Sequence, residues 1–179
     1  MKGVVFTMFG ELVEEQFGFD VWDELIEVTE PPSKGIYIAT DVYPDEELLA
    51  YVAALSARAG VPSNQLVYAF GEYMLGRFKD SHPEFFSGHD LSSFLQSVHQ
   101  VIHVEVKKLH ADAVLPTFTY EDNGPQELVM IYQSPRKLCA LAEGLISASA
   151  THFGQQLSCQ HETCMHDGAS HCRLKLSFG

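Results

Sequence analysis

The spacing of apolar residues changes its period near the middle of the chain, and this change limits the fold more than any other feature. Up to residue 111, apolar side chains recur three and four positions apart, the spacing of one face of an α-helix. This pattern predicts helices over residues 11–19, 21–28, 44–59, 63–79 and 91–111. Asp20 and Ser63 are the predicted N-caps, and Gly60 is the predicted helix stop.

The pattern in the second part of the chain predicts mainly strands. Two strand-like runs within residues 117–132 flank Asn123-Gly124, a pair typical of a β-hairpin. A helix is predicted over 138–153, after Pro135, and alternation returns within 157–178 around a turn at Asp167-Gly168. Helices first, then strands around one helix, predict an α+β fold.

Size and charge narrow the class of protein. With 179 residues and 46% hydrophobic content, the chain fits one domain over 1–179. Acidic residues interrupt the apolar N-terminal residues, and no run approaches the roughly 20 apolar residues that span a bilayer, so we expect a soluble, cytoplasmic protein. A formal net charge of −13 would repel phosphates, which argues against nucleic acid or a membrane as partner.

Three donors occur at alternate positions where a predicted strand meets a predicted helix. In Tyr132-Gln133-Ser134-Pro135-Arg136, the tyrosine, serine and arginine can point to one side of an extended chain. The planar fork of arginine suits a carboxylate, and the two hydroxyls suit a second one. The alternative is an ordinary strand end with a solvated arginine.

The predicted long helix carries three histidines beside its apolar stripe. His99, His103 and His110 lie within about 40° of one another on a helix of about 100° per residue. Any of them could present a nitrogen to a metal in an apolar pocket, or could be a partly buried histidine bonded to backbone. Periodicity does not choose among the three.

The order and spacing of these residues resemble one known pattern. His103, then Leu115-Pro116, then Tyr132-x-Ser134-x-Arg136 resemble the axial histidine, proline and Tyr-x-Ser-x-Arg of the haem nitric oxide/oxygen binding (H-NOX) family. The Met1-Lys2-Gly3 start and the total length resemble the family too, so that the likeness covers essentially the whole chain.

The resemblance implies the H-NOX fold, with haem b between a distal helical subdomain over about 1–62 and a proximal α/antiparallel-β subdomain over about 63–179. It implies that His103 is the protein ligand to the haem iron and that Tyr132, Ser134 and Arg136 hold the propionates. It also implies that Pro116, with Leu115 beside it, presses on the macrocycle and keeps it bent.

The resemblance also bears on the choice of gas. Members that hold O2 stably resemble one another in having a distal tyrosine five residues beyond the motif arginine, and here that position is Leu141. Bound O2 is stabilised by a hydrogen-bond donor, so an apolar wall disfavours O2. Such a wall does not disfavour nitric oxide or CO. We expect the same wall to include Val5, Phe9, Met74 and Leu145. Tyr73, a neighbour of this wall, is an alternative donor.

The C-terminal tail concentrates cysteine and histidine. Cys159, His161, Cys164 and Cys172 have a spacing compatible with tetrahedral zinc, and spacing alone leaves His166 and His171 open as ligands. Some H-NOX proteins resemble this chain in carrying zinc on three cysteines and one histidine. That resemblance implies the ligands Cys139, His161, Cys164 and Cys172 and leaves Cys159 spare. Reduced structural thiols are the alternative, and zinc would be either structural or redox-sensing.

The resulting expectation is a sensor and not an enzyme. The resemblance implies that nitric oxide binds ferrous haem, that His103 is released, and that the helix carrying it moves. The partner would be a separate protein of two-component or related signalling, such as a histidine kinase or a cyclic-di-GMP enzyme. The alternatives are an oxygen-binding sensor or carrier and a zinc/thiol redox-sensing module; a missing distal acid or base argues against a haem enzyme.

Overall fold

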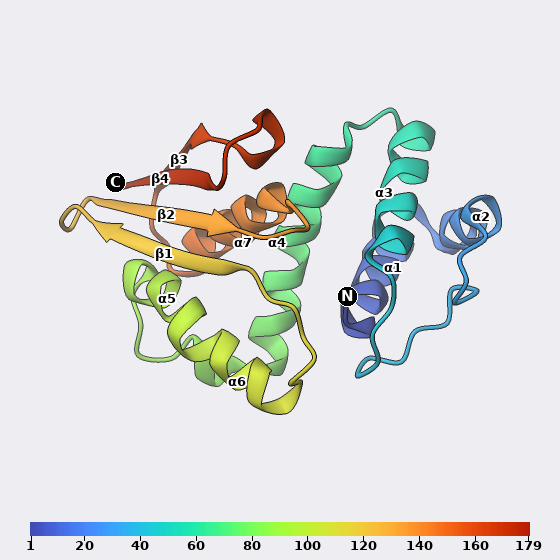
Figure 1. Ribbon diagram of the computed structural model, residues 1–179, viewed down its shortest axis with the longest axis horizontal. Coiled ribbons are helices and arrows are strands. Elements are labelled where there is room, and N and C mark those ends of the chain that lie inside the picture. The colour runs from blue at the N-terminus through green and yellow to red at the C-terminus, as the bar shows by residue number, and fades with distance from the viewer.

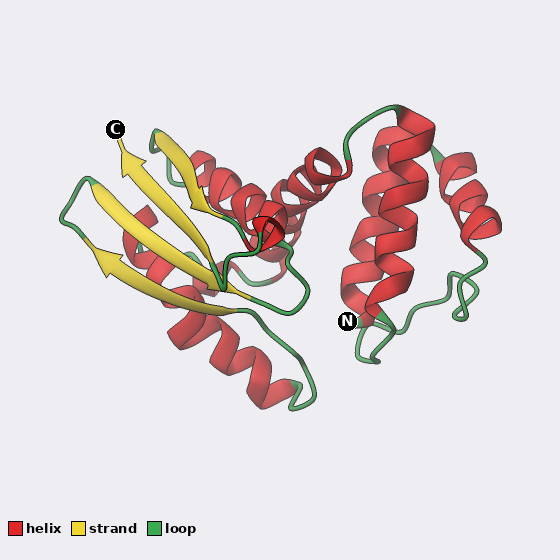
Figure 2. Cartoon of the chain, turned by 45° about the horizontal axis from the view of Figure 1, so that its top comes forward, coloured by secondary structure: helices red, strands yellow, loops and turns green.

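Three N-terminal helices form a helical layer at one end of the molecule. The structure, a computed structural model, describes residues 1–108 and 110–179 in full and gives Leu109 only its place in a helix. Helices α1 (Gly3–Phe17), α2 (Phe19–Thr29) and α3 (Asp45–Ala59) lie together, away from the strands (Figure 1, Figure 2). Their apolar faces form one buried cluster that includes Phe6, Phe9, Val13, Leu25, Tyr51 and Leu55.

Helix α4 (Ser63–Ser81) joins this layer to the rest of the chain. Its Leu66, Phe70 and Met74 belong to the N-terminal cluster, whereas Leu75 belongs to a second cluster under the sheet. In Figure 1 it passes between α1–α3 and the strands. One helix therefore contributes to both apolar cores.

The strands form a four-stranded antiparallel sheet in the order β1-β2-β4-β3. They are β1 (Thr117–Asp122), β2 (Glu127–Gln133), β3 (Leu157–Thr163) and β4 (Cys172–Phe178). Strict alternation in β4 buries every second residue, and these side chains pack against α5 (Leu91–Ser97) and α7 (Cys139–His152). The buried face includes Phe118, Leu128, Met130, Tyr132, Cys172, Leu174 and Leu176.

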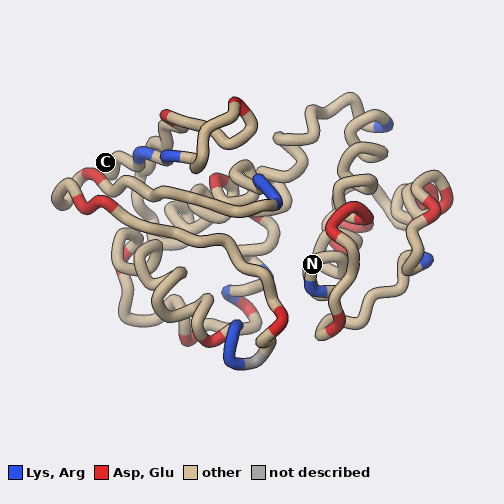
Figure 3. The backbone as a smooth tube through the Cα atoms, viewed as in Figure 1, with Lys and Arg blue, Asp and Glu red and all other residues tan. Residues whose placement is uncertain are grey.

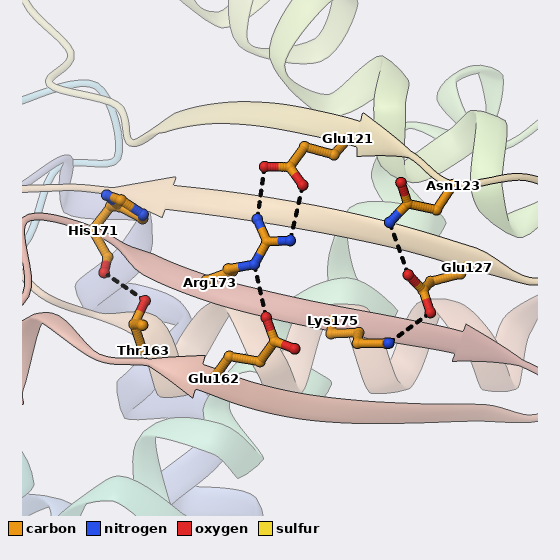
Figure 4. Close-up of polar contacts among 8 residues, drawn as sticks. All are labelled: Glu121, Asn123, Glu127, Glu162, Thr163, His171, Arg173 and Lys175. Atoms are coloured by element: carbon orange, nitrogen blue, oxygen red, sulfur yellow. Dashed lines mark hydrogen bonds and ion pairs between the residues drawn. The ribbon is translucent and has the colours of Figure 1, made fainter.

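The opposite face of the sheet carries a row of ion pairs. Arg173 donates to Glu121 and Glu162 at 2.7 Å each, and Lys175 lies 2.8 Å from Glu127 (Figure 4). Aspartate and glutamate residues occur along the backbone in both halves of the molecule (Figure 3). This alternation of apolar and charged residues fixes the register, because a shift by one residue would bury the charges.

The segment expected as one helix over 91–111 contains a change of helix type. Helix α5 runs into a π-helical turn, Val98–Ile102, which leads directly into α6 (His103–Leu109). A π turn holds one more residue than an α turn and is common at functional sites. His103 therefore follows a local irregularity of the helix.

Most element types are confirmed, but several boundaries were wrong. The first helix begins at Gly3 and not near Glu11, and Gly18 precedes the second helix in place of Asp20, which lies in its first turn. Ser63 is the first residue of α4, not its cap. The stop at Gly60 is confirmed by its left-handed φ of 68°.

Both predicted turns are confirmed. The hairpin between β1 and β2 turns at Asn123-Gly124, where Gly124 has φ 103°, and Gly168 has φ 90° in the turn before β4. The α+β class is thus the observed fold. Among the described residues, no helix combines the length and apolar character needed to cross a membrane.

Candidate functional site

His103 combines burial with an unused ring nitrogen. Its Nδ1 is buried and has no hydrogen-bond partner among the described residues. Burial, with a smaller contribution from His99, lowers the pKa of His103 to about 4, although the carbonyl of Pro116 acts in the opposite direction. The imidazole is therefore neutral near pH 7, the state in which histidine binds a metal.

The two other candidate histidines differ from His103. The ring of His99 lies 6.2 Å from that of His103 and also has a buried, unpartnered Nδ1 among the described residues, whereas His110 follows the end of α6. The ring of His103 lies 5.8 Å from that of Phe118 on β1, and the ring of Phe118 lies 5.6 Å from that of Tyr132. These aromatic contacts bring His103 toward the Tyr-x-Ser-x-Arg segment.

Tyr132 and Ser134 are buried where β2 ends. Their side chains are 3% and 4% exposed. The Tyr132 hydroxyl accepts the N–H of Leu138 at 3.0 Å, and Ser134 Oγ accepts the N–H of Arg136 at 3.2 Å. The two hydroxyls thus hold a sharp turn and can still donate their own protons to an acceptor.

Arg136 already holds a carboxylate and a carbonyl. Its Nε donates to Asp45 on α3 at 2.6 Å, and Nη1 donates to the Val114 carbonyl, next to Leu115 and Pro116. Burial would raise the pKa of Asp45, but hydrogen bonds from Arg136 and the amino group of Met1 keep it below its ordinary value. The Arg136 guanidinium therefore stabilises the ionised form of a partly buried carboxylate.

The proposed distal residues lie together in the N-terminal apolar cluster. Phe9 and Met74 are buried members of this cluster, and Val5, Leu141 and Leu145 are partly buried and pack against the cluster. The alternative donor, Tyr73, has its hydroxyl bonded to Glu15 at 2.9 Å and to Arg77 Nε at 3.0 Å. Its oxygen is thus engaged with charged groups between α1 and α4.

Close contact between two helices positions Leu141. Helices α4 and α7 cross at Gly71 and Gly144, where an added Cβ on Gly71 would lie 2.3 Å from the Leu141 carbonyl. Only glycine allows this approach, which brings α7 against the N-terminal cluster.

A second group of side chains lies under the β3–β4 turn. The ligand atoms of Cys139, His161, Cys164 and Cys172 all lie within 4.8 Å of one another. Cys159 lies outside this group and is exposed, His166 contacts the Lys137 carbonyl, and His171 contacts Ser170. The structure thus brings together the set that includes Cys139.

The donor set suits a soft divalent metal. Burial, and then the neighbouring thiols, raise the pKa of Cys139, and burial raises that of Cys172. The thiols of Cys139 and Cys172 are therefore poor thiolates by themselves, and a bound cation would offset their charge. His161 Nε2 is buried without a partner among the described residues, so it is free to complete a Cys3His tetrahedron.

Two partners of these residues were missed by sequence reasoning. Asp45 binds Arg136 across 91 positions, and no local pattern joins them. Glu143 binds His161 and lies four residues after Cys139, so that the helical spacing could have placed it beside the thiols.

Comparisons with known proteins identify the family and the fold of this chain. The family model described as Haem-NO-binding matches residues 2–161. An H-NOX protein from S. oneidensis in the Fe(II)NO state is 34% identical, with TM-score 0.93 and coverage of 100% of this chain and 99% of that one. An unliganded Fe(II) H-NOX protein from K. algicida is 32% identical, with TM-score 0.93 and coverage of 100% and 97%.

A third similar structure is an H-NOX domain from Shewanella oneidensis in the Fe(II)CO state, at 34% identity and TM-score 0.90, covering 100% of this chain and 99% of that one. A search of curated proteins gives no match. The match to the family model and the full-length likeness to these structures place the chain in the H-NOX family of haem-binding gas-sensor domains.

Proposed function

We propose that this protein is a nitric oxide sensor that holds haem b on His103 between residues of about 1–62 and about 63–179. The haem would supply the ferrous iron that binds the gas. The observation that carries the proposal is the neutral, partly buried His103, linked through Phe118 to Tyr132 and hence to the Tyr-x-Ser-x-Arg turn.

Tyr132, Ser134 and Arg136 would hold the two propionates. Arg136 would do so with the fork that now binds Asp45, and the two hydroxyls would donate from the buried turn. Leu115 and Pro116 lie in the link between α6 and β1, beside the Val114 carbonyl that Arg136 binds. From there they would contact the face of the macrocycle on the His103 side and keep it bent.

The apolar cluster around Leu141 supports nitric oxide over O2. Val5, Phe9, Met74 and Leu145 offer no donor, and the Tyr73 hydroxyl is bonded elsewhere. Bound O2 gains from a hydrogen bond that nitric oxide does not need. CO would bind for the same reason as nitric oxide.

Output would depend on His103. When nitric oxide binds, His103 would leave the iron and its helical segment would shift against the N-terminal helices, a two-state change driven by differential affinity. Release of His103 would be the event read by a separate protein, such as a histidine kinase or a cyclic-di-GMP enzyme.

We also propose zinc on Cys139, His161, Cys164 and Cys172. It would tie the β3–β4 turn to the first residue of α7, three residues after Arg136. That position makes a structural role for zinc the simpler one, with redox sensing as the alternative.

The decisive experiment is an absorption spectrum of the reduced protein without gas, in air, and with nitric oxide. We expect haem binding, no stable O2 complex, and a nitric oxide complex in which the band pattern indicates loss of the histidine ligand. A stable O2 complex would refute the argument from Leu141 and favour an oxygen sensor or carrier. Failure to bind haem would refute the sensor and leave the zinc/thiol module.

A further inference from the structure

A cavity of about 510 Å³ lies between α4, α7 and β3, and His161 of the proposed zinc site lines it. Polar side chains on its wall include Tyr68, Glu143, Ser147, Cys159 and His161. Two of these, Glu143 and His161, contact each other, and His161 belongs to the proposed zinc ligands. The cavity therefore borders both members of the Glu143–His161 pair.

The contact between Glu143 and His161 is short and largely shielded. His161 Nδ1 lies 2.5 Å from Glu143 Oε1, and the two side chains are 24% and 23% exposed. A carboxylate accepts and does not donate when ionised, so the proton of a neutral imidazole belongs on Nδ1. The lone pair is then on Nε2, the nitrogen that is buried without a partner among the described residues.

The backbone explains why this pair forms. Cys139 and Glu143 are one helical turn apart on α7 and therefore lie on the same face of that helix. His161 comes from β3, which contacts α7, and it is one of the half-buried residues of that strand. Helix α7 thus supplies both a thiol ligand and the carboxylate that meets the histidine.

We propose that Glu143 is a positioning residue for the metal site. It fixes the ring and the tautomer of His161 so that Nε2 faces Cys139, Cys164 and Cys172. A carboxylate on the far nitrogen also makes the imidazole a stronger donor, and loss of such a partner typically weakens metal binding by roughly 10–100-fold. This inference rests on the proposed zinc site and extends it to a residue that is not a ligand.

Zinc affinity of the haem-loaded protein tests the proposal. The protein is dialysed against buffers of fixed free zinc, and the zinc retained per chain is measured by mass spectrometry. Glu143→Ala, which removes acceptor and charge, should weaken binding by roughly 10–100-fold, and Glu143→Gln, which keeps an acceptor, should fall between it and the wild type.

Glu72→Ala is the matched control. Glu72 lies on α4 and accepts a hydrogen bond at 3.1 Å from Ser147, a residue of the same cavity. The variant removes the same charge from the same region without touching His161, so it should bind zinc like the wild type. Equal weakening in Glu72→Ala and Glu143→Ala would overturn the proposal and indicate a general charge effect.

A second measurement reports the tautomer of His161 directly. In the wild-type CO complex, nitrogen-15 NMR of the histidine rings should show His161 with its proton on Nδ1, and that signal should change in Glu143→Gln. A proton on Nε2 would overturn the inference, as would wild-type zinc affinity in Glu143→Ala. If the wild type itself retains no zinc, the zinc site fails, and this inference with it, while the haem spectrum still tests the gas sensor separately.

Discussion

Replacement of Gly144 by alanine tests the close crossing of α4 and α7. An ideal Cβ on Gly144 would lie 2.0 Å from the Tyr68 carbonyl oxygen, 2.9 Å from its carbon and 3.1 Å from the Gly71 Cα. Ordinary contact begins at 3.4 Å, so the two helices must separate by more than an ångström. The obstacle is backbone and not a flexible side chain, so no rotamer change relieves it.

The magnitude follows from two opposing effects. Overpacking of this kind costs about 3 kcal/mol or more when the backbone must move. Alanine recovers about 1 kcal/mol through its better helix propensity, so Gly144→Ala should lose about 2 kcal/mol or more of the free energy of unfolding. For a chain of this length that corresponds to a melting temperature lower by about 4–8 °C.

Gly76→Ala on the same α4 is the control. A Cβ at Gly76 would meet nothing within 4 Å. The substitution should therefore raise stability by about 0.5–1 kcal/mol. Thermal unfolding of both haem-loaded variants, followed by circular dichroism at equal haem content, gives the comparison. If Gly144→Ala were as stable as Gly76→Ala, the crossing described above would be wrong.

Three further predictions concern the gas site and the sheet. Leu141→Tyr should slow O2 dissociation by about 10–100-fold, which corresponds to a hydrogen bond to a charged acceptor of about 1.5–3 kcal/mol, and Leu141→Phe should not slow it. Absorption spectra after admission of air distinguish the two variants. Equal behaviour of the two variants would refute the role of a donor. His103→Gly should retain little haem unless imidazole is supplied, as measured by haem per chain; full retention without imidazole would contradict its role as ligand. Hydrogen bonds from Arg173 lower the pKa of Glu121, so this pair stabilises the fold above the ordinary glutamate pKa of about 4.3 and the stabilisation is lost as pH falls through the lowered value. Between about pH 5 and about pH 3, the free energy of unfolding in urea should therefore fall less for Arg173→Gln than for the wild type. An equal fall in both proteins would show that the pair is screened by solvent.

Local signals predicted much of the fold. Gly60, Asn123-Gly124 and Gly168 mark real ends and turns, because a positive φ is a property that glycine satisfies by itself. The start of α1 at Gly3 was missed, since no capping side chain precedes it and Lys2 makes no cap hydrogen bond. A helix stabilised by burial and not by a cap leaves little local signal.

The candidate site was predictable only where its residues share a segment. Tyr132, Ser134 and Arg136 act within one turn, so their spacing carries the information. The partner of Arg136 is Asp45, the first residue of α3, which comes close to it only in the folded chain, 91 positions away in sequence. The choice of His103 among three histidines likewise depends on Phe118, which lies on a strand.

The π-helical turn before His103 lets the helix hold an extra residue without changing the direction of that imidazole. Each residue of an α-helix advances the side-chain direction by about 100°, and the turn Val98–Ile102 adds one residue to the count. The π turn fits that extra residue into about the rotation of one α turn, so deletion of Gln100 would restore a regular helix and leave His103 near its present direction. Deletion of both Gln100 and Val101 would instead turn His103 by about 100° around the helix axis. A change that touches no proposed ligand would thus disable the site by altering phase, but only once more residues are removed than the π turn has absorbed.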